Sequence, residues 1–229
     1  NDLRFTESRL ESARNFANKV WNAARYVITS LEGKPGLEGW RNLPLPSNRQ
    51  DRWIVARLDR VTAEVNASME NFELGEAQQK LYDFIWNEFC DWYIEMAKIR
   101  MRSDTGPSPL PVLAHVLERT LRLLHPFMPF ITEEIWQNLL AQLPKETTTE
   151  GEIAESIMVS PYPTANGDRQ DDQAEEEISL VMQAIRAVRN ARAQLHIPAN
   201  RQLEALVEAN GAQKALEEES EVIRTLSRV

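Results

Sequence analysis

The chain has 229 residues, of which 42% are hydrophobic, 27% are charged and only 8 are glycine, with a formal net charge of −9. This composition is typical of a helix-rich globular protein rather than a disordered or β-sandwich one, and the length allows one large or two modest cores. The single cysteine excludes an internal disulfide and no apolar run reaches membrane-spanning length, so we expect a protein of the reducing cytoplasm with no membrane partner.

The first half of the chain predicts a series of helices. Apolar residues recur at steps of three and four over residues 6–30, which is the spacing of one helix face. Glycines and prolines between residues 33 and 46 predict a loop, and a second helix is expected from Asp51 to about Val65, with a pause at 71–75. Residues 81–96 are apolar almost all round, as expected of an enclosed helix, so we take them as the central element of a bundle.

The second half is less regular. Helical periodicity returns at 112–124 and at 131–139, and the acidic segment 144–172 contains one short extended candidate at 157–159. A long helix is predicted over 171–196, a strand at 203–207 and a helix at 211–228. The sequence therefore predicts a mainly α fold, with a bundle of about five helices over residues 1–165 and a small, incomplete α+β piece over residues 166–229, because a lone strand leaves its edges unpaired.

Patterns for catalysis and metal binding are missing from the sequence. It contains no G-x-x-x-x-G-K-[ST] loop, no H-E-x-x-H, and no Glu three residues before any of its three histidines. Cys90 and His125 are expected to be structural side chains. We therefore expect no catalytic residue, no metal site and no cofactor in this sequence.

Charge is distributed unevenly along the chain. Residues 1–60 contain 11 Lys and Arg against 7 Asp and Glu, whereas residues 145–180 contain 2 against 10. Between Ile178 and Leu203 there are arginines, Arg186 and Arg189 among them, and no acid. Because phosphate binding requires positive potential, we predict that these two basic regions face a polyanion while the acidic segments face elsewhere.

The most informative stretch lies within the first predicted helix. At 100° per residue, polar and aromatic side chains fall on one arc opposite the apolar stripe. Rings and guanidinium planes stack on unpaired bases, amides read base edges and cations hold phosphates, so this mixture suits an unpaired RNA loop. An ordinary solvated helix face is the alternative, and the residues alone favour it. The arc consists of Arg14, Asn15, Asn18, Lys19, Asn22, Arg25 and Tyr26, and Trp21 borders the apolar side, where a core role is expected.

Several segments resemble the C-terminal region of class I aminoacyl-tRNA synthetases, and the valine-specific members most closely. The segments are RNFANK (14–19), WNAAR (21–25), FCDWYIE (89–95), LHPFMPFITEEIW (124–136), SPYP (160–163) and RNAR (189–192). The 124–136 segment is the most specific, because its F-M-P-F-I form is typical of the valine enzymes. The corresponding region of the isoleucine or leucine enzymes remains an alternative, as does a helical protein-interaction module without RNA.

The resemblance implies a bundle that grips the anticodon stem-loop of valine tRNA, with no DNA partner, in a monomeric protein. It implies a catalytic domain of the same chain that uses ATP and Mg²⁺, although the signatures that bind ATP are absent from these 229 residues. The hypothesis gives base stacking to Tyr26 or Trp21 and base edges to Asn18 and Asn22. The remaining candidates for contact with tRNA are Arg14, Asn15, Lys19, Arg25, Arg186 and Arg189.

Overall fold

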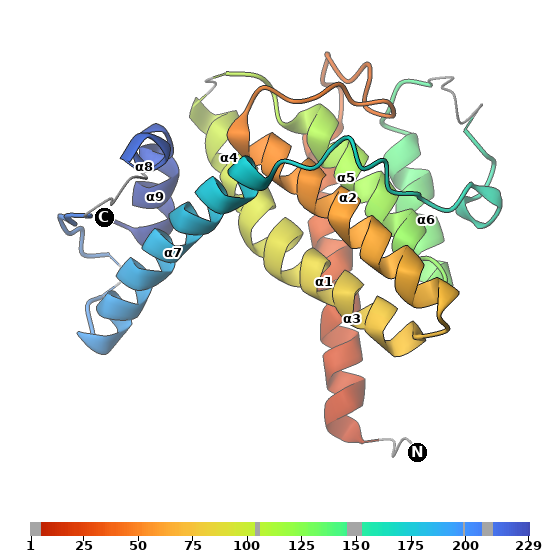
Figure 1. The fold of residues 1–229 in the computed structure, drawn as a ribbon, viewed down its shortest axis with the longest axis horizontal. Coiled ribbons are helices and arrows are strands. Elements are labelled where there is room, and N and C mark those ends of the chain that lie inside the picture. The colour runs from red at the N-terminus through yellow and green to blue at the C-terminus, as the bar shows by residue number, and fades with distance from the viewer. Residues whose placement is uncertain (1–5, 104–105, 146–152, 199, 208–212) are drawn as a thin grey trace.

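The computed structural model describes residues 6–103, 106–145, 153–198, 200–207 and 213–229. Within these ranges the chain forms helices and irregular segments but no strand. Its first part is a bundle of helical rods, one of which is made of three consecutive elements (Figure 1). The rods are α1 (Glu7–Leu31), α2 (Arg49–Glu70), the run of α3 (Leu74–Asp83), η1 (Phe84–Tyr93) and α4 (Ile94–Ser103), α5 (Leu110–Leu124) and α6 (Pro129–Leu140). The prediction of a mainly α fold with a bundle of about five helices is confirmed.

Helix α1 combines a buried stripe with a long exposed face. The buried side chains recur at steps of three or four, which places them on one side of the helix against α5, α6 and η1. They are Phe16, Val20, Ala24, Val27 and Leu31. Residues 6–15 are all exposed, and Figure 1 shows this end of α1 extending beyond the rest of the bundle.

Within residues 81–96, expected to form an enclosed central helix, most apolar side chains are buried, but Asp83, Asn87 and Asp91 are exposed, so this is not the most enclosed part of the bundle. That part is α5, whose side chains from Val112 to Leu124 are all buried except Arg119. Element η1 is a π-helix, and the N–H of Ile94 at its end donates to the carbonyl of Phe89, five residues earlier. This wider helix could not be predicted from the sequence, because side-chain periodicity does not report the backbone hydrogen-bond pattern.

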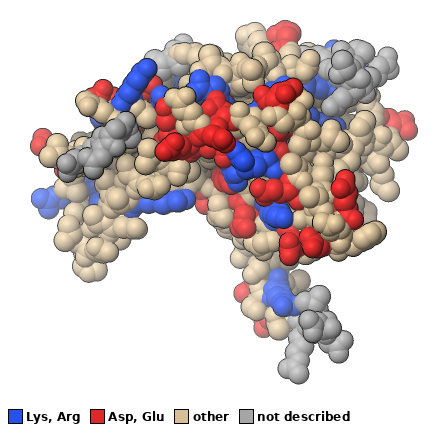
Figure 2. Space-filling model, viewed as in Figure 1, with Lys and Arg blue, Asp and Glu red and all other residues tan. Residues whose placement is uncertain are grey.

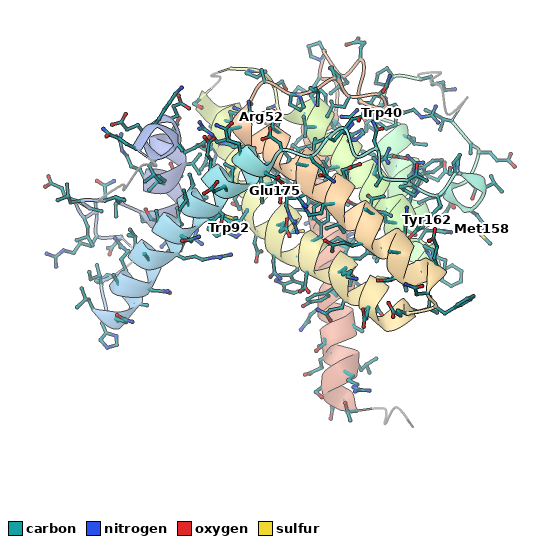
Figure 3. All side chains as sticks on the ribbon, viewed as in Figure 1. Trp40, Arg52, Trp92, Met158, Tyr162 and Glu175 are labelled. Atoms are coloured by element: carbon teal, nitrogen blue, oxygen red, sulfur yellow. The ribbon has the colours of Figure 1, made fainter. Side chains whose placement is uncertain are left out.

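Helix α7 (Asp172–Gln194) begins beside α2 and extends away from the bundle (Figure 1). Ion pairs fasten its first turns to the arginines of α2, and Figure 3 shows Arg52 and Glu175 on these two helices. Acidic and basic side chains are accordingly interleaved on this face in Figure 2. The pairs are Arg49 with Glu177, Arg52 with Asp171 (N–O 3.0 Å), Arg57 with Glu175 (3.4 Å), and Arg60 with Asp172 (2.8 Å) and Glu175 (3.0 Å).

These ion pairs correct one expectation. Four of the acidic residues within 171–177 do not face away from the basic N-terminal region, since they pair with the arginines of α2: Asp171, Asp172, Glu175 and Glu177. The positive charge that residues 1–60 can offer to a polyanion is therefore smaller than the residue count suggests. It is concentrated instead on α1, where Arg14 and Arg25 are exposed.

Both strand predictions are wrong within the described residues. Segment η2 (Ile157–Val159) is a 3₁₀ helix, started by the Ser156 side chain, which accepts from the N–H of Met158. Residues 203–207 have no regular structure, because no neighbouring segment pairs with them. The helical prediction over 211–228 is confirmed for the described residues, although they form two helices, α8 (Gln213–Glu218) and α9 (Ser220–Ser227), with a turn at Glu219, and residues 211–212 lie outside the described part. A division of the chain at 165/166 stays a prediction.

The buried guanidinium of Arg192 holds the irregular segment after α7 in place. Its nitrogens donate to the carbonyls of Arg228 (2.9 Å), Pro198 (2.9 Å) and Arg201 (2.8 Å). These contacts satisfy backbone acceptors without a sheet, and the Pro198 carbonyl also accepts from the N–H of Arg201 at 3.1 Å. None of the helices in the described part of the chain is long and apolar enough to cross a membrane.

Candidate nucleic-acid interface

The polar arc of α1 is open to solvent. Arg14, Asn15, Asn18, Asn22 and Arg25 are all exposed, and they lie opposite the buried stripe of the same helix. The Asn22 side-chain oxygen accepts a hydrogen bond from Arg25 Nη2 at 3.4 Å, which orders two neighbouring polar groups on this face. An extended ligand can therefore reach the amides and guanidinium groups without any rearrangement of the bundle.

Two members of the arc, Lys19 and Tyr26, are half-buried on the side that faces η1 and α4. Lys19 Nζ lies 2.6 Å from Asp91 Oδ1 and 5.0 Å from the ring centroid of Trp86. The ring of Tyr26 is covered by the ammonium group of Lys98, 4.7 Å from its centroid. A covered ring offers little surface for a base, so Tyr26 is a weaker candidate for stacking than the sequence suggests.

Trp21 lies on the opposite edge of the arc, toward α6. The expectation of a core role is wrong, because 42% of its surface is exposed. It lines a shallow hollow of about 350 Å³ together with Arg25, Ile28, Glu134 and other residues of α1 and α6. Among the aromatic residues of α1, Trp21 therefore offers an exposed ring on which a base can stack.

A groove of about 570 Å³ brings Lys19 of α1 close to Arg186 and Arg189 of α7. Along the sequence these residues belong to two separate basic regions. Packing of α7 and α9 beside η1 and α4 closes the distance between them. The groove is lined by Lys19, Asn87, Cys90, Asp91, Trp92, Glu95, Arg186, Arg189 and Leu226.

Trp92, which was not predicted as a site residue, positions the arginines of this groove. The Cζ atoms of Arg186 and Arg189 lie 5.3 Å and 5.6 Å from the centroid of its ring, within the range of cation–π attraction. Arg189 Nε also donates to the carbonyl of Leu226 at 2.8 Å. Figure 3 shows Trp92 beside α7. The three-residue spacing of the two arginines, which puts them on one helix face, was the available signal.

The anticodon-binding domain of tRNA ligases is the family whose model matches residues 51–207. The chain belongs to this family. The matched region contains Trp92, Arg186 and Arg189, whereas the polar arc of α1 precedes it.

Relatives of this anticodon-binding domain cover the whole chain, the arc included. The chain is 46% identical over 228 residues to the valine–tRNA ligase of Dehalococcoides mccartyi (strain CBDB1), and this match covers 100% of the chain and 25% of that protein. It is 44% identical over 223 residues to the valine–tRNA ligase of Oceanobacillus iheyensis, covering 94% of the chain and 23% of that protein. The chain thus spans about a quarter of the length of these relatives.

A solved structure shares the fold of this anticodon-binding domain. It is the LeuRS of Agrobacterium radiobacter K84 in a ternary complex with tRNA and LeuAMS. The TM-score is 0.51 at 20% identity, and the match covers 74% of this chain and 18% of that one.

The three cationic side chains in the groove of this anticodon-binding domain differ in how available they are to a bound anion. Lys19 is paired with Asp91, which largely neutralises its charge. Arg186 and Arg189 have exposed side chains and form no ion pair with a described carboxylate, which leaves them able to hold an anion. Attraction of phosphate to the groove therefore depends on these two arginines.

Cys90 and His125 are structural in this domain, as expected. Burial raises the pKa of the Cys90 thiol to about 12, which keeps it protonated and unreactive. His125 Nδ1 is 2.8 Å from the hydroxyl of Thr132 and ties the end of α5 to α6. The described residues contain no group of three His, Cys, Asp or Glu side chains placed to hold a metal ion.

Proposed function

We propose that this chain is the anticodon-binding part of a valine–tRNA ligase and that it binds the anticodon stem-loop of valine tRNA. A catalytic domain in the same chain would join valine to this tRNA with ATP and Mg²⁺, and the protein would act as a monomer in the cytoplasm. Membership of the family and the valine–tRNA ligase relatives, which match the chain over its full length, support the proposal.

The observation that carries the proposal is the arrangement of α1 and α7 around the groove. An exposed helix face with three asparagines and two arginines continues, through Lys19, into a groove that holds two further arginines. Unpaired bases need amide and ring partners, whereas the backbone that follows them needs cations. The two elements supply these groups side by side.

The role of each side chain in tRNA binding follows from its accessibility. Asn18 and Asn22 present amides to base edges, and Trp21 presents an exposed ring for stacking. Arg186 and Arg189 hold phosphates, because Trp92 and the Leu226 carbonyl keep their guanidinium groups in position.

Valine codons fix the middle anticodon base as A and the last as C, so two bases must be read. Stacking contributes about 1–3 kcal/mol per base, so two engaged bases supply roughly 2–6 kcal/mol. That free energy corresponds to about 30-fold to 10⁴-fold in affinity, but stacking is tolerant of base identity, so discrimination between anticodons depends on hydrogen bonds from Asn18 and Asn22 to base edges.

The test is a titration of the chain with anticodon stem-loops of valine, isoleucine and leucine tRNAs at several salt concentrations, with binding monitored by fluorescence anisotropy. We expect a preference for the valine loop and a steep loss of affinity with salt, because each phosphate contact releases counterions. Arg186→Ala should lower the affinity and reduce the salt slope by about 1, whereas Trp21→Ala should lower the affinity with the slope unchanged.

The matched control is Arg102→Ala, which removes an exposed arginine that does not line the groove. Equal affinity for the three loops would contradict a valine-specific role. Binding that does not depend on salt and is unaffected by Arg186→Ala would contradict RNA recognition through the groove and would favour a protein-interaction module.

A further inference from the structure

Helices α7, α8 and α9 form an arm at one side of the bundle (Figure 1). The arm is tied together at the far end of α9, where Arg189 Nε donates to the Leu226 carbonyl. It carries Arg186 and Arg189, whereas Trp92 and Lys19, on the other side of the groove, belong to the bundle. The arrangement of charges in the groove therefore depends on how the arm is held.

The first turn of α7 is one point of attachment of the arm. Three arginines of α2 form ion pairs with acids in this turn: Arg52, Arg57 and Arg60. At about 1.5 Å per residue, Arg189 lies about 21 Å further along the helix than Glu175. A rotation of about 10° around that turn would shift Arg189 by about 4 Å, beyond the reach of about 6 Å within which its guanidinium group contacts the Trp92 ring.

Arg49 provides a second point of attachment, which reaches two parts of the arm. Its guanidinium group contacts three carboxylates, one from α7 and two from the junction of α8 and α9. Nε donates to Glu177, Nη2 donates to Glu218 Oε2 at 2.6 Å, and Nη1 lies 3.5 Å from Glu219 Oε1. Apolar burial is non-directional, whereas charge-assisted contacts to a planar guanidinium group fix an orientation. Arg49 can therefore set the angle of the arm.

Burial makes the Arg49 contacts difficult for solvent to replace. The side chains of Arg49 and Glu219 are only 13% and 7% exposed, and Gln50 Nε2 donates to the same carboxylate at 2.6 Å. Burial raises the pKa of Glu219, and the hydrogen bond from Gln50 and the charge of Arg49 oppose this shift. Without Arg49 the three carboxylates lose the cation that they share, and their mutual repulsion separates the arm from α2.

We propose that Arg49 is a positioning residue for RNA binding, which sets the angle of the arm so that Arg186 and Arg189 lie beside Trp92. The part that concerns RNA rests on the proposed function, which assigns these two arginines to phosphates. Arg49 does not line the groove and its side chain is largely buried, so it acts through the arm and not by contact with RNA.

Cys90 reports the position of the arm without RNA. It is the single cysteine of the chain, it is buried, and it lines the groove between η1 and α7. The experiment measures the rate at which a thiol reagent labels Cys90 in the folded chain. Arg49→Gln should raise this rate at least about tenfold, because removing one partner of a buried ion pair leaves uncompensated charge that displaces the arm.

The matched control is Arg60→Gln, which makes the same substitution on the same helix. Arg60 pairs with Asp172 and Glu175 in the first turn of α7, and it should change the labelling rate little, because these contacts are more exposed to solvent. Arg49→Lys keeps a positive charge among the carboxylates and should restore most of the protection of Cys90. Urea unfolding of each variant confirms that it is folded under the labelling conditions.

Titration with the valine anticodon stem-loop measures the consequence for RNA. Arg49→Gln should reduce the salt slope by about 2, as should the double variant Arg186→Ala/Arg189→Ala, because both lose two phosphate contacts. Adding Arg49→Gln to that double variant should cause no further loss of affinity. A loss of folded protein alone would lower the active fraction and leave the salt slope unchanged.

An unchanged labelling rate of Cys90 in Arg49→Gln would overturn the proposal, whatever the result with RNA. Faster labelling with an unchanged salt slope would overturn the role of Arg49 in RNA binding, since the arm would then move without consequence for the phosphate contacts. Absence of RNA binding by the wild-type chain would contradict the proposed function and this role with it, and the labelling rates would still decide whether Arg49 positions the arm.

Discussion

Lowering the pH from 7.5 to 5 should destabilise the protein by about 2 kcal/mol through His115 alone. Burial, reinforced by Arg119 and Arg169, lowers the pKa of His115 in the folded state to about 3 from the ordinary value of 6.5. As the pH falls through 6.5, the unfolded chain takes up a proton on this imidazole and the folded chain does not. Stability is therefore lost progressively below about pH 6.5, and the loss ends near pH 3, where the folded state also binds the proton.

The magnitude follows from the separation of the two pKa values. Between pH 7.5 and 5, the unfolded state gains protonation free energy equivalent to about 1.5 pH units, at about 1.36 kcal/mol per unit. The assay is urea unfolding monitored by tryptophan fluorescence at pH 5, 6 and 7.5, in buffers without phosphate. The reference is His115→Asn, whose side-chain amide can still donate to the Trp40 carbonyl but does not titrate.

The quantity to compare is the difference in unfolding free energy between wild type and His115→Asn at each pH. Other titrating groups are common to both proteins and cancel in this difference. It should change by about 2 kcal/mol in favour of the variant on going from pH 7.5 to 5. Parallel pH profiles would refute the reasoning, because they would mean that the folded protein protonates His115 as readily as the unfolded chain does.

Three further substitutions test the packing that positions the interface. Arg57→Ala removes two hydrogen bonds to Glu88 (2.7 and 2.9 Å), and the loss of this half-buried pair should lower the free energy of unfolding in urea by about 1–3 kcal/mol. An exposed ion pair contributes about 0–1 kcal/mol, so a loss below about 0.5 kcal/mol would show that solvent screens the pair. Leu81→Ala should lower the free energy of unfolding by about 2–5 kcal/mol, because the Leu81 side chain is fully buried. The control Leu45→Ala, at an exposed position, should lower it by less than about 0.5 kcal/mol, and equal effects would contradict the placement of the core. Asn48→Ala should cost about 1 kcal/mol, because its side chain caps the first turn of α2, and an unchanged melting temperature would argue against that cap.

The helices could be predicted because their signal is local. In α1, the steps between Phe16, Val20 and Ala24 follow the helical period, so both the helix and its buried side could be assigned without knowing its neighbours. The same periodicity predicted the exposed polar arc. It misplaced Trp21, which borders the apolar stripe by angle, because α6 leaves that edge of α1 open to solvent.

The incorrect predictions concern segments without a strong local period. Residues 157–159 are apolar and short, and a side-chain hydrogen bond from the backbone to Ser156 was enough to coil them into a 3₁₀ turn. Residues 203–207 alternate as a strand does, but a strand forms only beside a partner, and the described structure provides none. The pairing of α2 with the acidic start of α7 was also beyond local reasoning, since those residues are more than a hundred positions apart.

The order of residues by itself determined that the chain is helical, which side of each helix is apolar and, through its short motifs, which family it resembles. These properties depend on neighbours within a few turns of backbone. Only the tertiary structure decided which charges remain available to a ligand. Packing of α7 on α2 neutralised one set of arginines, and packing beside η1 set Arg186 and Arg189 against Trp92 opposite Lys19. The folded packing also gathered Glu177, Glu218 and Glu219 around Arg49, because Coulombic and hydrogen-bonding partners are chosen by distance in space and not along the chain.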